Sequence, residues 1–228
     1  MDFTFGIITG GNDDMINIII DSIEKEDIPN YEIIIVGHCG VDRKNTKLIP
    51  FDENVRRAWI TKKKNEITKA ATYENVVYLH DYIKLEEGWY KGQLKAGNDF
   101  SIRMDKIIDN NGARYRDWCI WPHNGNDMDT FIGRDCLIPY ELTHLSKYMY
   151  ISGSYWISKK DIMIEFPLNE SLTWGQGEDV QWSKEVRVKY EFDMNINSTV
   201  KIMKGGKDKV FNEPNLDKVN KLKTIVYD

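Results

Sequence analysis

The chain has 228 residues, of which 41% are hydrophobic and 29% are charged, a composition that fits a globular protein and excludes intrinsic disorder. Its net charge is −5 and its basic residues are spread along the sequence, so we expect no nucleic-acid partner. No segment approaches the roughly 20 apolar residues of a membrane span, and the first residues lack the pattern of a signal peptide. Together with three cysteines that lack zinc-site spacing, these features predict a cytoplasmic protein.

The first half of the sequence alternates short apolar runs with segments of helical periodicity. The apolar run over 3–9 stops at Gly10-Gly11-Asn12-Asp13, residues that are typical of turns. Isoleucines then recur at helical spacing. Strands that alternate with helices predict right-handed crossovers and a mostly parallel sheet flanked by helices. The expected elements are a strand over 3–9, a helix over 15–23, strands over 31–36 and 55–60, a helix over 65–73 and a strand over 76–79.

The second half is less regular. A strand is expected over 150–157, a helix over 159–166 and another helix over 178–189. The sequence contains no internal repeat, low-complexity stretch or linker, so the simplest interpretation is one α/β domain over residues 1–228.

Two polar loops follow expected parallel strands. One covers residues 10–14, after the first strand, and the other is His80-Asp81-Tyr82, after the strand over 76–79. Parallel sheets bind ligands outside the carboxyl ends of their strands. We therefore expect a binding site where these two loops meet.

Several motifs in order give the chain a resemblance to a known family. These are GGND after the first strand, YEIIIVG, KKKN, VVYL followed by HDY, ISGSYWISKK and WGQGEDVQWS. Together they resemble the inverting GT-A glycosyltransferases of the family 2 kind, and WGQGED with the later NEPN (212–215) is similar to β-1,4-galactosyltransferases. The resemblance implies a GT-A domain that moves one sugar from a nucleotide-diphosphate donor, with UDP favoured over GDP, to an acceptor hydroxyl with inversion. The VQWS segment departs from the QxxRW element of processive members, which favours a single addition; the acceptor could be a glycan, a protein or a small molecule.

The resemblance also implies which residues contact the donor. In the family, the loops after the first and second strands receive the base and ribose, and small polar residues there can approach a ligand closely. The same residues would equally suit ordinary turns, and the lysines of KKKN an ordinary solvated surface. The candidates are Thr9, Gly10, Asn12, Asp13, Gly37, His38, Lys64, Asn65, His80, Asp81, Gly153 and Lys204.

His80-Asp81-Tyr82 stands where the family has its metal-binding DxD element. By resemblance Asp81, with His80 beside it, would hold Mn²⁺ or Mg²⁺ against the diphosphate. The sequence departs from the pattern, because only one of the three residues is an acid. The late metal-binding histidine of the galactosyltransferases is also missing from 202–206, where Lys204 could supply fixed positive charge instead.

Glu178 and Asp179 are the candidate catalytic residues. Inverting transfer needs a general base for the acceptor hydroxyl, and the resemblance gives that role to Asp179, with Glu178 adjusting its pKa or holding the acceptor. Acidic residues are also common at helix starts, but the preceding Gly-Gln-Gly favours the catalytic interpretation. Candidate acceptor contacts are Trp118, Tyr155 and Trp174. The alternative is a catalytically impaired GT-A-like module that binds a sugar nucleotide or glycan without turnover.

Overall fold

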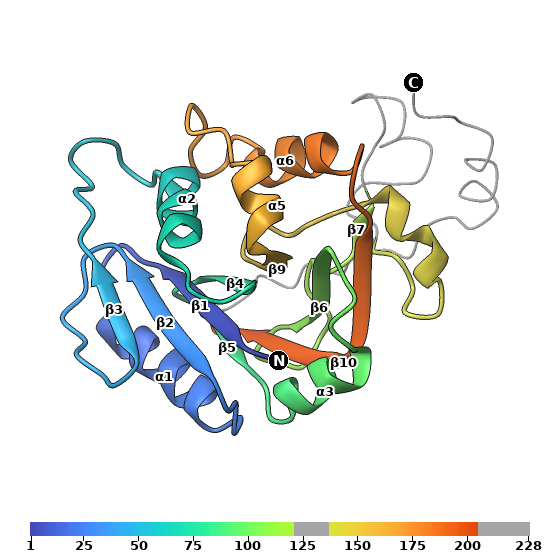
Figure 1. Cartoon of the computed structure of the whole chain (residues 1–228), viewed down its shortest axis with the longest axis horizontal. Coiled ribbons are helices and arrows are strands. Elements are labelled where there is room, and N and C mark those ends of the chain that lie inside the picture. The colour runs from blue at the N-terminus through green and yellow to red at the C-terminus, as the bar shows by residue number, and fades with distance from the viewer. Residues whose placement is uncertain (121–136, 205–228) are drawn as a thin grey trace.

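The computed structural model describes residues 1–120 and 137–204, and an eight-stranded mixed sheet runs through them (Figure 1). The strand order is β3-β2-β1-β4-β9-β6-β10-β5. A separate two-stranded sheet joins β7 (Cys119–Ile120) to β8 (Met149–Tyr150). The strands of the large sheet are β1 (Phe3–Ile8), β2 (Tyr31–Val36), β3 (Thr46–Ile49), β4 (Asn75–His80), β5 (Ile83–Leu85), β6 (Ile102–Ile108), β9 (Tyr155–Lys159) and β10 (Phe192–Ile202).

The first four of these strands form the parallel part of the sheet. β3, β2, β1 and β4 run parallel, whereas β9 is antiparallel to both β4 and β6. β1 and β4 are buried along their whole length, as expected for central strands that helices cover on both faces. The carboxyl ends of β1, β2 and β4 therefore lie at one edge of the sheet, where Thr9, Gly37 and Asp81 follow them.

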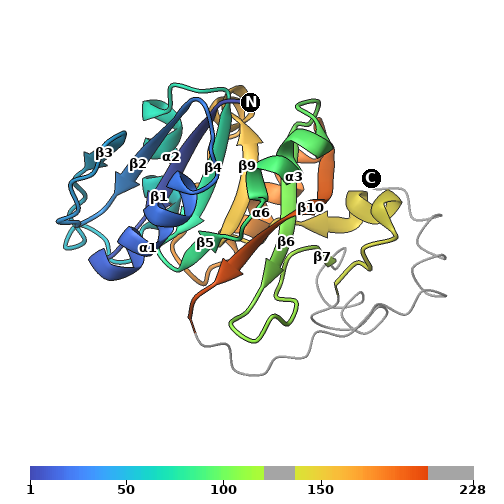
Figure 2. The same ribbon diagram turned by 90° about the horizontal axis from the view of Figure 1, so that it is seen from below.

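Helices cover both faces of the sheet (Figures 1 and 2), with α2, α5 and α6 on one face and α1 and α3 on the other. Phe3 and Phe5 of β1 contact Trp89 of α3, while Gly6, on the opposite face of β1, lies against α2. A Cβ atom at Gly6 would lie 2.2 Å from Ile67, so α2 can approach β1 this closely only above a glycine. The helices are α1 (Asp13–Glu24), α2 (Ile60–Ala70), α3 (Trp89–Ala96), the 3₁₀ helix η1 (Thr143–Tyr148), α5 (Lys160–Glu165) and α6 (Glu178–Val186).

The prediction of a strand over 55–60 is wrong. These residues form a loop that leads into α2 at Ile60, and the edge strand is β3 instead. Side chains hold the loop away from the sheet, because Arg56 and the Trp59 indole both donate to the carbonyl of Glu170, at 2.8 and 2.7 Å. The strand expected over 150–157 is also interrupted, since β8 ends at Tyr150 and β9 begins at Tyr155.

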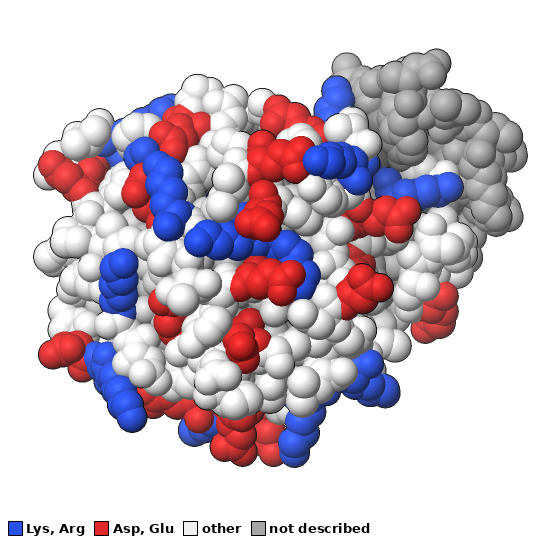
Figure 3. Space-filling view, viewed as in Figure 1, with Lys and Arg blue, Asp and Glu red and all other residues white. Residues whose placement is uncertain are grey.

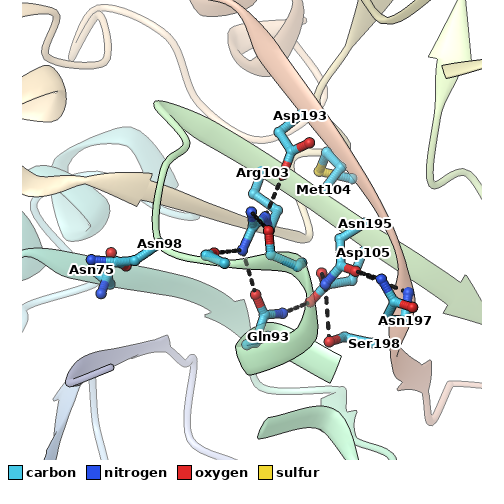
Figure 4. Close-up of polar contacts among 12 residues, drawn as sticks. Asn75, Gln93, Asn98, Arg103, Met104, Asp105, Asp193, Asn195, Asn197 and Ser198 are labelled. Atoms are coloured by element: carbon cyan, nitrogen blue, oxygen red, sulfur yellow. Dashed lines mark hydrogen bonds and ion pairs between the residues drawn. The ribbon is translucent and has the colours of Figure 1, made fainter. Parts of the chain in front are cut away.

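A buried polar network joins β6, β9 and β10 to α3 (Figure 4). Asp105 of β6 accepts hydrogen bonds from Gln93 at 2.7 Å, from Asn195 at 2.8 Å, and from Trp89 at 2.8 Å. Tyr155 of β9 donates a fourth, so Tyr155 is a structural residue of this network. Burial raises the pKa of Asp105, and the four donated hydrogen bonds oppose that shift because they stabilise the ionised form.

We expect the substitution Asp105→Asn to destabilise the fold by about 3 kcal/mol, because an amide NH₂ would face buried donors and leave them unsatisfied. Asp99→Asn is the matched control, since Asp99 is exposed and should change stability by less than about 0.5 kcal/mol. Urea denaturation measures both values. Equal effects of the two substitutions would show that the network does not contribute.

Candidate functional site

Two adjoining cavities lie at the carboxyl edge of β1 and β4. The larger, of about 810 Å³, is lined by the end of β1, the loop before α2, Asp81 and Lys204. The smaller, of about 380 Å³, is lined by the turn before β9, the start of α6 and Arg116. His80, Tyr82 and Trp174 line both cavities, so the two form a continuous site with a shared boundary.

Glu178 and Asp179 bring two carboxyl groups into the smaller cavity. They form the first turn of α6, which begins at Gly177 in a left-handed conformation (φ 72°) that glycine adopts without strain. Asp179 Oδ2 accepts from the backbone N–H of Gly153 at 2.9 Å, and its Oδ1 accepts from Val180 N at 2.9 Å. The structure thus brings together the two residues expected to be catalytic, and two backbone donors orient the Asp179 carboxylate.

Gly153 must lack a side chain for this arrangement to form. A Cβ atom at this position would lie 2.9 Å from Glu178 Oε1 and 3.0 Å from Asp179 Oδ2. Such distances are below those of ordinary contacts, and both atoms belong to the carboxylates themselves. Glycine therefore allows the backbone to approach both acids directly.

Lys64 of α2 lies beneath the smaller cavity. It is 1% exposed, donates to the Gly153 carbonyl at 2.6 Å, and lies 4.5 Å from the ring centroid of Trp156. Burial lowers the pKa of Lys64 to about 8, although the charges of Glu178 and Asp179 oppose the shift. Lys64 therefore supports the wall of the site, and it is not among the residues that line either cavity.

Glu178 and His80 are both shifted towards their neutral forms. Burial raises the pKa of Glu178, whereas the charges of Lys64 and Arg116 lower it. Burial also lowers the pKa of His80 well below its usual value, and the charges of Lys64 and Lys204 add to that effect. His80 is therefore a neutral imidazole at pH 7, and its Nε2 has no hydrogen-bond partner among the described residues.

Asp81 anchors the loop that follows β1. Its Oδ2 accepts from Thr9 Oγ1 at 2.8 Å and from Gly10 N at 3.4 Å, and its own N–H donates to Ile8 O. Thr9 Oγ1 in turn accepts from Gly11 N at 2.9 Å. Thr9, Gly10 and Asp81 all line the larger cavity, as the sequence led us to expect.

The residues at the end of β4 offer few ligands to a divalent metal ion. Within the described residues no three His, Cys, Asp or Glu side chains are grouped as ligands. Asp81 already has one oxygen engaged with the β1 loop, and it lines only the larger cavity. Its neighbours at the shared boundary are His80 and Tyr82, neither of which is a carboxylate. Mn²⁺ and Mg²⁺ favour oxygen ligands, so the protein offers a single carboxylate where the family pattern has two.

Several expected site residues lie elsewhere in the fold. Asn12 caps α1, and Asp13 accepts from Gly40 N at 3.1 Å. Asn65 is buried and bonds to the backbone of Leu168. The remaining residues outside the two cavity linings are Gly37, which is packed against Thr9; His38, which is exposed; and Trp118 and Tyr155, which are fully buried.

Trp174 does line the site, as expected of an acceptor or sugar contact, and is 67% exposed. Glu53, Asn54 and Arg57 of the larger cavity were not among the expected site residues, because the apolar pattern predicted a strand over part of their loop. Arg116 was not among them either. Arg116 has a positive φ of 36°, which is rare for a residue with a side chain, and it lines the smaller cavity. The sequence alone carries no signal for this backbone conformation. The motif at 212–215 lies outside the described residues.

Charged side chains of both signs are interspersed on the face shown in Figure 3. The described residues on that face form no extended region of one sign, unlike the continuous basic surface of many nucleic-acid-binding proteins. No helix within 1–120 or 137–204 combines the length and the apolar character that crossing a membrane requires.

Comparison with solved structures identifies the fold. TarS 1–349 of S. aureus in complex with UDP-GlcNAc has a TM-score of 0.62 at 14% identity, over 90% of this chain and 60% of that one. GalNAc-T7 with UDP, GalNAc and Mn²⁺ has a TM-score of 0.60 at 14% identity, over 91% of this chain and 45% of that one. The chain has the GT-A fold. It spans 59% of the length of TarS 1–349 in its free form. No protein-family model matches the sequence, and no curated protein matches it either.

We expect the substitution Lys64→Met to change how stability depends on pH. The lysine pKa is about 8 in the folded protein and about 10.4 in an unfolded chain, so the unfolded state binds more protons between these values. The free energy of unfolding of the wild type, relative to Lys64→Met, should therefore rise between about pH 8 and about pH 10, by up to about 3 kcal/mol. Urea denaturation measures it.

The exposed lysine Lys44 provides the control for this measurement. The difference between the wild type and Lys44→Met should stay flat over the same pH range. A flat difference for Lys64→Met as well would contradict a depressed lysine pKa.

Proposed function

We propose that the protein is a glycosyltransferase that moves one sugar from a UDP-sugar to an acceptor hydroxyl with inversion, and that the whole chain forms one GT-A unit. The observation that carries the proposal is the pair of adjoining cavities at the carboxyl edge of a GT-A sheet. One is bordered by cations without an ion-pair partner among the described residues, and the other by two carboxyl groups. TarS and GalNAc-T7 are glycosyltransferases of the same fold, and the solved TarS structures include complexes with UDP-GlcNAc and with UDP.

The larger cavity is the proposed nucleotide site. Thr9 and Gly10 supply backbone and hydroxyl groups at the end of β1, and its volume of about 810 Å³ suits a ligand of nucleotide size. The donor sugar would then extend across the boundary formed by His80, Tyr82 and Trp174 into the smaller cavity. The exposed Trp174 ring offers an apolar surface for a pyranose face.

Asp179 is the proposed general base. Its carboxylate is held by Gly153 N and Val180 N, so it is oriented before the acceptor arrives. In the proposed step the acceptor hydroxyl gives its proton to Asp179 as its oxygen bonds to the anomeric carbon. The bond between that carbon and the diphosphate oxygen breaks, and its electron pair leaves with UDP. Glu178, whose pKa is raised by burial, is placed to hold the acceptor beside the base.

A second candidate function is a GT-A-like module that binds a sugar nucleotide without turnover. The observation that favours it is the single carboxylate at the end of β4, where a metal-dependent enzyme would need more oxygen ligands. Assays for release of UDP from a panel of UDP-sugars, with candidate acceptors, separate the two. A binding module would bind nucleotide and release none.

Asp179→Asn should reduce transfer by about 10²- to 10⁴-fold, because the amide cannot accept the acceptor proton, while UDP binding stays close to that of the wild type. Glu178→Gln is the matched variant, with an expected loss of about tenfold, since it removes a neighbouring group and leaves the base intact. Initial rates and UDP titration of both proteins test the assignment. A larger loss in Glu178→Gln than in Asp179→Asn would move the base to Glu178.

Nucleotide preference tests the donor separately. The small polar residues Thr9 and Gly10 at the larger cavity, together with the UDP complexes of structural neighbours, lead us to expect that UDP binds at least about tenfold more tightly than GDP. Titration calorimetry with both nucleotides under identical conditions measures the ratio. A clear preference for GDP would overturn the donor assignment.

A further inference from the structure

The larger cavity is lined by three cationic side chains, Arg57, Lys63 and Lys204, which differ in whether a protein carboxylate pairs with them. Lys63 is committed within the protein, because it donates to Thr9 O at 2.6 Å and pairs with Glu53. Arg57 and Lys204 also line the cavity, and neither has an ion-pair partner among the described residues. Both are exposed to solvent. The cavity therefore has positive charge available to a ligand.

The acidic side chains of the same cavity, Glu53 and Asp81, are engaged through both oxygens and through Oδ2, respectively. Glu53 pairs with Lys63 and accepts from Ala58 N at 3.1 Å, and Asp81 accepts from Thr9 and Gly10. A divalent cation needs free oxygen ligands, whereas an anionic ligand needs free cations. The balance of free groups favours direct binding of an anion.

Lys204 has a defined position at the boundary between the cavities. Its Nζ lies 4.0 Å from the ring centroid of Tyr82, a contact that holds an ammonium group through the ring quadrupole. Tyr82 lines both cavities, so this charge lies where a diphosphate in the larger cavity would meet a sugar in the smaller one. Arg57 comes from the loop before α2, far from Lys204 in the sequence, and its planar guanidinium can bind phosphate oxygens in pairs.

We propose that Arg57 and Lys204 neutralise the diphosphate of the donor directly, in place of a divalent metal ion. The inference rests on the proposed function, because it assumes a nucleoside diphosphate in the larger cavity. The two cations bind the diphosphate in the ground state and stabilise the negative charge that develops on it as the glycosidic bond breaks. The metal-binding DxD pattern is then dispensable, which accounts for a sequence that has His80 and Tyr82 around its one acid.

Titration calorimetry with UDP and with uridine, in EDTA and in MnCl₂, tests the inference. In EDTA we expect UDP to bind at least about tenfold more tightly than uridine, and Mn²⁺ to change UDP affinity by less than about threefold. Arg57→Met and Lys204→Met should each weaken UDP about tenfold and leave uridine unchanged. Lys44→Met, at another exposed lysine, should change neither affinity. Melting temperatures establish that each variant is folded.

Loss of UDP binding in EDTA that Mn²⁺ restores would overturn the inference, whatever the variants do. Unchanged UDP affinity in both Arg57→Met and Lys204→Met would overturn it as well. If neither UDP, GDP nor uridine binds under any condition, the proposed function itself fails, which is a result distinct from a requirement for metal.

Discussion

The two hydrogen bonds of the Gly153 backbone are the interaction on which the site depends. Its N–H donates to Asp179 at 2.9 Å and its carbonyl accepts from Lys64 at 2.6 Å, so one residue links α6 to α2 on the same face of the sheet. A buried ammonium alone would be strongly unfavourable, and so would two adjacent carboxyl groups in a partly closed cavity. Each offsets the other, because the carboxylates favour the charged lysine and the lysine lowers the pKa of Glu178. The buried ammonium of Lys64 and the carboxyl groups of Glu178 and Asp179 therefore stabilise one another.

The sequence predicted the elements whose signal is local, and it missed the features that depend on contacts between distant residues. Continuous apolar runs predicted β1, β2 and β4, because a strand buried on both faces carries that signal locally. The broken strand before Tyr155 depends instead on contacts between Gly153 and residues more than twenty positions away, which no local pattern records. The apolar residues near Trp59 similarly imitate a strand until the hydrogen bond to Glu170 is known.

The same contrast between local and long-range information applies to the residues of the candidate site. Thr9, Asp81 and Glu178 were candidate site residues from the sequence and do line the cavities, since they follow strands or begin a helix at an edge that topology defines. Their exact neighbours were not predictable. Trp118 was a candidate acceptor contact but is fully buried, donating to Met104 O at 3.1 Å. Arg57 lay in a segment assigned to a strand, so its position in the larger cavity became apparent only from the structure.

Under the proposed function, the distribution of charge over the two cavities would orient the donor. Arg57 and Lys204, which have no ion-pair partner among the described residues, line the larger cavity, whereas Glu178, Asp179 and Arg116 line the smaller one. At the boundary between them, burial keeps His80 neutral, while the Tyr82 ring holds the ammonium group of Lys204 at 4.0 Å from its centroid. In the proposed complex, the anionic diphosphate lies among the cations of the larger cavity and the sugar extends past His80 and Trp174. The anomeric carbon would then lie within reach of an acceptor hydroxyl beside Glu178 and Asp179.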